Sequence, residues 1–248
     1  HRGLLNWRGE KDQAFHEAQQ VSKEFAKLPS LQRKPANTGI VLDYESLWSI
    51  EMEPYNRNFS YWNLVYEIYA TCWQQGIAVD FLPRNAELTG YDTVIVPAAT
   101  IVHDDEVERW GAWVEAGGQL IITCRTFTRT PSNTSVRESI PQHLTSLIGA
   151  EVATFDSVPS EHYSDWPQHL PGKQVVRAGH DRLRLNYKIW IESLIPTDAT
   201  PTWYYDDGLL KGKVAAVEKQ IGQGRIQYIG FWPTNFSLVL DTSGLKAN

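Results

Sequence analysis

The stretch TGIVLD at residues 38–43 decides the fold that we expect for this chain. It is short, apolar and rich in β-branched residues, which is typical of a buried strand. Residues 60–75 follow as an expected helix, with Gly76 at the position after the helix end where glycine is favoured. Residues 77–82 then have the pattern of a second strand. A strand, a helix and another strand in this order indicate a parallel pair with a helical crossover.

The same alternation continues toward the middle of the chain. Further strands are expected over 93–98, 118–123 and 151–155, and further helices over 104–116 and 141–148. We therefore expect an α/β fold with an open, doubly wound, mostly parallel sheet of the flavodoxin-like or class I glutamine amidotransferase-like type. The connection 43–59 is long and follows the first strand, where open α/β sheets place ligand sites, so a pocket is expected there.

The character of the sequence changes in its last third. Residues 157–181 are rich in Pro, Ser, His and Asp and are expected to be irregular. Later strands are expected over 183–193, 200–205, 213–220 and 225–231, and Ile221-Gly222-Gln223-Gly224 between the last two indicates a hairpin. This pattern predicts a C-terminal antiparallel β extension, joined to the edge of the main sheet.

The first part of the chain has a different organisation. Residues 10–28 have apolar side chains at three- and four-residue steps, so they predict a helix, which Pro29 ends. Residues 30–37 are expected to be a linker. A helix with one apolar stripe before a linker suggests the tail of a preceding domain.

Composition excludes several classes of function. The formal net charge of -6 and the lack of a basic cluster argue against nucleic acid as a partner. The longest apolar runs have only strand length, so no membrane span is expected. Cys72 and Cys124 lack any metal-ligand spacing and are too few for a disulfide framework, which fits a reducing, cytoplasmic location. No metal and no cofactor is expected.

Two features of the sequence are candidates for a catalytic centre. Cys124 follows an expected strand, where a class I amidotransferase-like enzyme has its nucleophile, but no glycine flanks it to allow the sharp turn that such a residue needs. A buried cysteine at a strand end is the simpler interpretation. Acidic residues of the first connection, Asp43 and Glu45 among them, resemble the paired carboxylates of glycoside hydrolysis, yet helix capping and solvated acids explain them better. No catalytic residue is predicted.

Aromatic side chains gather around the first connection. The cluster consists of Trp48, Tyr55, Phe59, Tyr61 and Trp62. It is interpreted as core packing or as a contact surface between subunits, and these five residues are the interface candidates. An alternative is a carbohydrate-binding module that uses the aromatic loop 44–62 to stack on sugars.

Several of these segments resemble the middle domain of family 42 β-galactosidases. Leu42-Asp43-Tyr44-Glu45-Ser46-Leu47-Trp48 is similar to that family's D-Y-E-S-x-W signature and is the most specific match. Further matches, in the family's order, are Tyr61-Trp62, Gly76-Ile77-x-Val79-Asp80, Gly90-Tyr91-Asp92 and Glu115-Ala116-Gly117-Gly118-x-Leu120. His1-Arg2-Gly3-Leu4-Leu5 resembles the end of the family's catalytic barrel, where the histidine contacts bound galactose.

The resemblance implies that catalysis and subunit assembly belong to different domains. The family hydrolyses terminal β-D-galactosides with retention, through two glutamates on a barrel that would precede His1. Residues 1–37 would then be the tail of a missing barrel, 38–235 a trimerisation domain and 236–248 a tail or the start of a small β domain. The galactoside would bind only in the missing barrel, with His1 as a remnant of that site, and the domain present would assemble a homotrimer. A cyclic trimer requires two different, complementary surfaces on each subunit.

Overall fold

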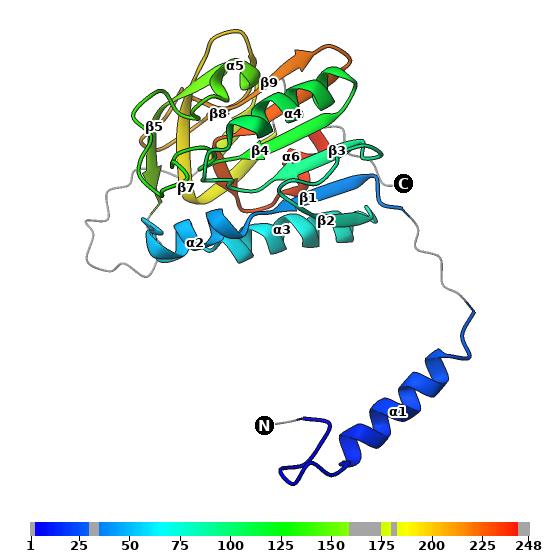
Figure 1. The fold of residues 1–248 in the computed structure, drawn as a ribbon. Coiled ribbons are helices and arrows are strands. Elements are labelled where there is room, and N and C mark those ends of the chain that lie inside the picture. Colours follow the sequence, from blue (N-terminus) through cyan, green and yellow to red (C-terminus); the bar gives the residue numbers. More distant parts are fainter. Residues whose placement is uncertain (1–2, 30–34, 159–174, 180–182, 243–248) are drawn as a thin grey trace. The chain divides into compact units, whose positions relative to one another are not determined.

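The computed structural model describes residues 3–29, 35–158, 175–179 and 183–242 (Figure 1). The chain divides into two units, His1–Pro35 and Ala36–Asn248. No helix in the described ranges has both the length and the apolar composition needed to cross a bilayer.

The first unit contains one helix, α1 (Gln13–Phe25). It begins where the Asp12 carboxylate accepts a hydrogen bond from the Gln13 backbone N–H, which satisfies one of the free donors of the first turn. None of its residues is buried, and Val21 and Phe25 expose their apolar side chains to solvent. The predicted helix is thus present, and the described residues of its own unit leave Val21 and Phe25 uncovered.

The second unit is built on an 11-stranded sheet whose first half is parallel. Its strands β1 (Thr38–Leu42), β2 (Val79–Pro83), β3 (Thr93–Val96) and β4 (Gln119–Thr123) lie in the order β2-β1-β3-β4 and pair in parallel. Successive side chains of these strands enter opposite faces of the sheet. Ile40, Ile95 and Ile121 therefore lie in one hydrophobic core, and their neighbours along each strand lie in a second core.

Helices cover both faces of this half (Figure 1). The first core contains side chains of α2 (Tyr44–Met52), α3 (Tyr61–Gln74) and α6 (Ser237–Thr242). The second contains side chains of α4 (Asp104–Glu115) and α5 (Thr145–Ile148). The connection 43–59, which was expected to be a long loop, therefore includes the helix α2.

The other strands form an antiparallel half. They are β5 (Ala150–Ser157), β6 (Val175–Ala178), β7 (Arg184–Pro196), β8 (Thr200–Tyr205), β9 (Val214–Ile221), β10 (Gly224–Ile229) and β11 (Phe231–Pro233). Strand β7 pairs with β5, β6, β9 and β11, always antiparallel. Because β6 also pairs with β8, and β8 with β9, the pairings of β6, β7, β8 and β9 form a closed circuit.

The prediction of an open, doubly wound, mostly parallel sheet of flavodoxin-like or amidotransferase-like type is wrong. Among the described strands, the parallel pairings are those of β1 with β2 and β3, and of β4 with β3 and β10; all others are antiparallel. The antiparallel strands are also more than a small extension, and they join the parallel half at β4, one of its edge strands, through β10. Strand β10 returns to the middle of the sheet and joins β4 to β9, so the two halves share one continuous ladder.

Candidate functional site

Asp43 stands at the carboxyl end of β1 and begins α2. Its Oδ1 accepts hydrogen bonds from the backbone N–H groups of Glu45 and Ser46, at 3.1 and 3.2 Å, and its Oδ2 accepts one from the Ser46 hydroxyl. The backbone N–H of Asp43 donates to the Tyr61 hydroxyl on α3 at 2.8 Å. Asp43 is therefore a helix cap, which confirms the simpler interpretation of this acid.

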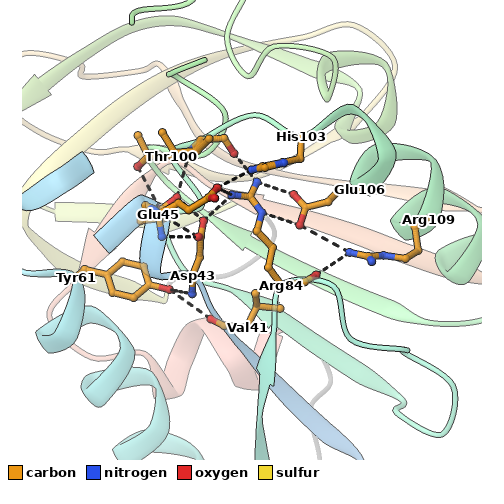
Figure 2. Close-up of polar contacts among 12 residues, drawn as sticks. Val41, Asp43, Glu45, Tyr61, Arg84, Thr100, His103, Glu106 and Arg109 are labelled. Carbon is orange, nitrogen blue, oxygen red and sulfur yellow. Dashed lines mark hydrogen bonds and ion pairs between the residues drawn. The ribbon is translucent and has the colours of Figure 1, made fainter. Parts of the chain in front are cut away.

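Arg84 connects this cap to α4 (Figure 2). It lies directly after β2, and its Nη1 donates to Asp43 at 2.8 Å while Nε and Nη2 donate to both oxygens of Glu106 at 2.7 and 2.6 Å. Asp43 and Glu106 are almost fully buried. One guanidinium thus serves two buried carboxylates in a forked geometry that lysine cannot supply.

The electrostatics of this network follow from burial. Burial raises the pKa of Glu106 above its usual range, and the hydrogen bonds and charge of Arg84 oppose that rise. Glu45, more than half exposed, lies 2.8 Å from His103 Nε2 at the rim of a cleft of about 340 Å³. Within the described ranges, no group of three or more His, Cys, Asp or Glu side chains is arranged to hold a metal ion. The pocket expected beside the first connection is therefore present, with its central acids committed to Arg84 and to the start of α2.

Sequence reasoning did not find Arg84 or Glu106. Arg84 comes after Pro83 in a segment without any motif, and Glu106 is one of three acids in the first turn of α4. Such acids are ordinary at a helix start. Only the folded structure brings the two residues together, because they belong to different strand–helix connections.

Cys124 does not have the environment of a nucleophile. The thiol is fully buried at the end of β4, and burial, with a further contribution from the charge of Glu192, raises its pKa well above the usual range. A cysteine nucleophile needs access and a stabilised thiolate. This environment is that of an inert structural cysteine, as the simpler interpretation has it.

The five predicted interface residues divide into two groups. Phe59 and Tyr61 belong to the hydrophobic core, with 4% and 2% of their surface exposed. Trp48, Tyr55 and Trp62 are exposed by 58%, 51% and 44%. The cluster is therefore not one continuous surface, and only three of its members can touch a partner.

A larger aromatic surface lies on the outer sides of α2 and α3. Its members, which we call the aromatic surface, are Tyr44, Trp48, Trp62, Tyr66 and Trp73, all at least 44% exposed. The Tyr44 ring lies 6.2 Å from that of Trp48 and 6.1 Å from that of Trp62, so the two helices share one patch. Tyr66 and Trp73 continue it along α3.

His1, the predicted remnant of a galactose site, lies outside the described residues. Its role is not tested by the structure. The carbohydrate-binding interpretation of residues 44–62 also stays a prediction, although residues 44–52 of this segment form α2 and residues 61–62 begin α3.

Comparison with known proteins gives consistent matches. A model of the β-galactosidase trimerisation domain family matches residues 36–240. The β-galactosidase Bga of Halorubrum lacusprofundi is 30% identical over 258 residues, which cover 99% of the present chain and 36% of that protein. The β-galactosidase BgaH of Haloferax lucentense is 30% identical over 233 residues, which cover 94% of the chain and 33% of that protein.

A solved structure agrees with these sequence matches. The polyextremophilic β-galactosidase from the Antarctic haloarchaeon Halorubrum lacusprofundi superimposes with a TM-score of 0.79 and 31% identity, and covers 98% of the chain and 36% of that protein. The chain therefore spans about a third of the length of the curated relatives that it matches.

Proposed function

The chain belongs to the family of β-galactosidase trimerisation domains, and from this membership we propose that it assembles copies of itself into a homotrimer through the aromatic surface on α2 and α3. The observation that carries the proposal is the exposure of the surface's three tryptophan and two tyrosine side chains, between 44% and 71%. Tryptophan and tyrosine are enriched in the buried centres of protein interfaces, whereas a large exposed aromatic patch is uncommon on a monomer.

The geometry of α3 supports the same role. Its inner side, with Leu64 and Ile68, is completely buried against the sheet, so the helix is already fixed without its aromatic side. An interface built on a rigid helix loses little conformational entropy on association. In a cyclic trimer the aromatic surface of one subunit meets a different surface of the next one.

We further propose that hydrolysis of terminal β-D-galactosides is carried out by a longer protein of which this chain forms the assembly part. The relatives are named β-galactosidases, and their sequences extend well beyond the matched third. The acids of the described site support this division. Asp43 and Glu106 are held by Arg84, and neither is poised to attack or protonate a sugar. On this proposal the galactoside contacts His1 and residues outside the chain.

The boundaries 1–37, 38–235 and 236–248 remain part of the proposal, as the tail of the barrel, the assembly domain and a C-terminal segment. A cytoplasmic location is proposed as well. Its support is that Cys72 and Cys124 are both buried free thiols, which is usual for proteins of a reducing compartment.

The mass of the chain in solution tests the assembly proposal. Light scattering after size exclusion should give three times the 28.2 kDa of one chain. Trp48→Ser should weaken assembly about 30-fold or more, because a buried aromatic anchor typically contributes about 2 kcal/mol or more to an interface. Ile195→Ser, a matched change of an exposed apolar residue on β7, serves as the control. A wild-type chain that stays monomeric at high concentration, or a Trp48→Ser variant that trimerises normally, would contradict the proposal.

A further inference from the structure

A second cavity lies apart from the cleft at Arg84 and from the aromatic surface. It encloses about 230 Å³. Its lining includes Tyr55, Arg125, Arg129, Phe155, Trp190 and Glu192. They come from the α2–α3 connection, from the segment after β4, and from β5 and β7. No residue of the aromatic surface lines this cavity.

One of its walls is aromatic. The rings of Phe155 and Trp190 are stacked at 5.3 Å with an angle of 16° between their planes. Tyr55 meets both rings edge-on, at 6.4 and 6.0 Å. Phe155 and Tyr55 are 43% and 51% exposed, whereas Trp190 is buried, so the aromatic wall extends from the surface to the bottom of the cavity.

A buried carboxylate holds this wall in place. Glu192 accepts hydrogen bonds from Trp190 Nε1 at 2.9 Å, from the Arg125 backbone N–H at 2.8 Å and from the Tyr228 hydroxyl at 2.7 Å. Gly230 packs against it so closely that an added Cβ would lie 3.2 Å from the Glu192 Cβ. The acid therefore fixes both the indole and the start of the segment that contains the two arginines.

The backbone around the cavity is strained at several points. Tyr55, Arg125, Asn133 and Ile189 have φ angles of 58°, 63°, 60° and 64°, in the left-handed region that side chains other than glycine seldom adopt. Two of them line the cavity, Ile189 precedes Trp190, and the carbonyl of Asn133 accepts a hydrogen bond from Arg129. Each such residue costs about 1–3 kcal/mol of backbone strain. Residues of this kind cluster at active sites and ligand-binding sites.

The two guanidinium groups give the cavity a positive side. Arg125 lies 4.8 Å from the centre of the Trp190 ring and donates to the backbone carbonyls of Glu53 and Pro54. Burial lowers its pKa to about 10, so it stays charged at neutral pH and a nearby anion would stabilise it. Arg129 is nine-tenths buried and donates to the Glu53 carboxylate and, at 2.7 Å, to the Tyr55 hydroxyl.

Glu53 indicates what kind of group Arg129 binds. Its side chain is 53% exposed and reaches Arg129 from the surface. Only the Glu53 side of this ion pair is open to solvent, so another carboxylate can approach Arg129 and compete with Glu53. A planar carboxylate also matches the fork of a guanidinium better than any neutral group does.

We propose that this cavity is a binding site for a small aromatic carboxylate, whose ring packs on Phe155 and Trp190 and whose carboxylate replaces Glu53 on Arg129. The aromatic wall favours a ligand with an apolar ring, and the two arginines favour a ligand with a negative charge. The enclosed volume accommodates a single ring with a short substituent.

Benzoate, its neutral analogue benzamide, and D-galactose are the probes. Calorimetric titration into the full chain should give saturable binding of benzoate and at least about tenfold weaker binding of benzamide, which lacks the charge. The indole N–H resonance of Trp190, assigned with the Trp190→Phe variant, should shift with benzoate over the same concentrations.

Two substitutions should act in opposite directions. Arg129→Gln should weaken benzoate binding about tenfold or more, whereas Glu53→Gln removes the competing carboxylate and should strengthen it severalfold. The control variants are Arg57→Gln and Glu51→Gln, which change exposed residues that do not line the cavity. Glu53→Gln changes only an exposed side chain, so the test stands even if Arg129→Gln fails to fold.

Three outcomes would overturn the proposal. The first is the lack of saturable benzoate binding at millimolar concentration in both the wild type and Glu53→Gln. The second is equal affinity for benzoate and benzamide. The third is a Trp190 shift with D-galactose and not with benzoate, which would identify a sugar site instead.

Discussion

Glu192 illustrates, at the scale of one residue, how a buried charge organises its surroundings. Its two oxygens accept hydrogen bonds from Trp190, Arg125 and Tyr228, and 1% of its surface is exposed. Glu192→Gln keeps the shape but can place an amide N–H₂ where a carboxyl oxygen accepts from the Tyr228 hydroxyl, which must then turn to accept instead of donate. We expect it to lower the free energy of unfolding by about 1–3 kcal/mol at acidic pH, measured by urea denaturation. Glu218→Gln, at a position on β9 that is 32% exposed, should change it far less.

The cost of Glu192→Gln should depend on pH. Burial raises the pKa of Glu192 above 4.5. The folded state therefore binds this proton more tightly than the unfolded state, and the wild type loses stability as the pH rises from 4.5 through the folded-state pKa. Glutamine does not titrate, so the difference between the two proteins should shrink as the pH rises over that window. A difference that grows with pH would mean that Glu192 is stabilised in its charged form.

Arg84 binds two buried acids, and its removal leaves Asp43 without this guanidinium and Glu106 with the longer ion pair to Arg109 at 3.7 Å. Asp43 and Glu106 are 3% and 2% exposed, and the guanidinium is their shared cation. We expect Arg84→Leu to lower the free energy of unfolding by about 3–5 kcal/mol at neutral pH. At acidic pH the loss should be smaller, since burial raises the pKa of Glu106 and this acid can then take up a proton. Thermal denaturation at two pH values measures both effects.

The comparison for Arg84 is Arg225→Leu on β10. The ion pair of Arg225 with Glu218 is partly exposed, and its loss should cost less than about 1 kcal/mol. Equal losses for the two variants would show that the Arg84 network contributes no more than an ordinary surface pair.

At the scale of single residues, the sequence predicted roles that depend on neighbouring residues in the chain. It did not predict contacts between residues that are distant in the chain. The capping role of Asp43 follows from its position before a helix, and the buried state of Cys124 follows from the apolar strand before it. Arg84 meets Asp43 across 41 residues of sequence, and Glu192 meets Arg125 across 67. Such contacts depend on which strands become neighbours, and periodicity carries no information about that.

At the scale of one element, helix α3 has a buried apolar side that packs in the core and an exposed aromatic side. Leu64 is fully buried and Tyr66 is 67% exposed, although both belong to the same turn of the helix. Leu64→Ala should lower the free energy of unfolding by about 2–5 kcal/mol, because it leaves a cavity in the core. Tyr66→Ala should change the stability of the monomer by less than about 0.5 kcal/mol.

The two α3 variants should differ in assembly as well. If the aromatic surface is an interface, Tyr66→Ala should weaken the trimer while Leu64→Ala mainly lowers the denaturation midpoint of the subunit. Sedimentation at several protein concentrations separates the two effects. A Tyr66→Ala chain that is unstable as a monomer and assembles normally would place this residue in the fold and not in an interface.

The elements themselves were largely predictable, whereas their pairing was not. Strands β1, β3 and β4 and helices α3 and α4 lie within a few residues of the predicted segments, because their patterns are local. The predicted sheet was wrong because the antiparallel strands of the last third were expected to form a minor extension, whereas they form the larger part of the sheet. Strand β6 lies in a segment that was expected to be irregular, and the four partners of β7 cannot be read from its sequence.

At the scale of the whole molecule, the continuous ladder through β4, β10 and β9 joins the parallel and antiparallel halves. The turn before β10 is packed tightly against the start of β4. A Cβ added at Gly224 would lie 2.1 Å from the Val114 carbonyl oxygen and 2.2 Å from that of Gly118, both of them backbone atoms. The two halves are thus expected to unfold together, as one cooperative unit.

Residues 1–35 form a compact unit of their own. No residue of α1 is buried, and the match to the trimerisation domain family begins at residue 36. A truncated chain of residues 36–248 should therefore unfold with the same midpoint as the full chain, measured by circular dichroism. If the aromatic surface on α2 and α3 assembles the subunits, the truncated chain should also keep the full chain's oligomeric state in light scattering. Loss of the trimer with an unchanged midpoint would assign assembly to residues 1–35, because the only part removed would then be the part that held the subunits together.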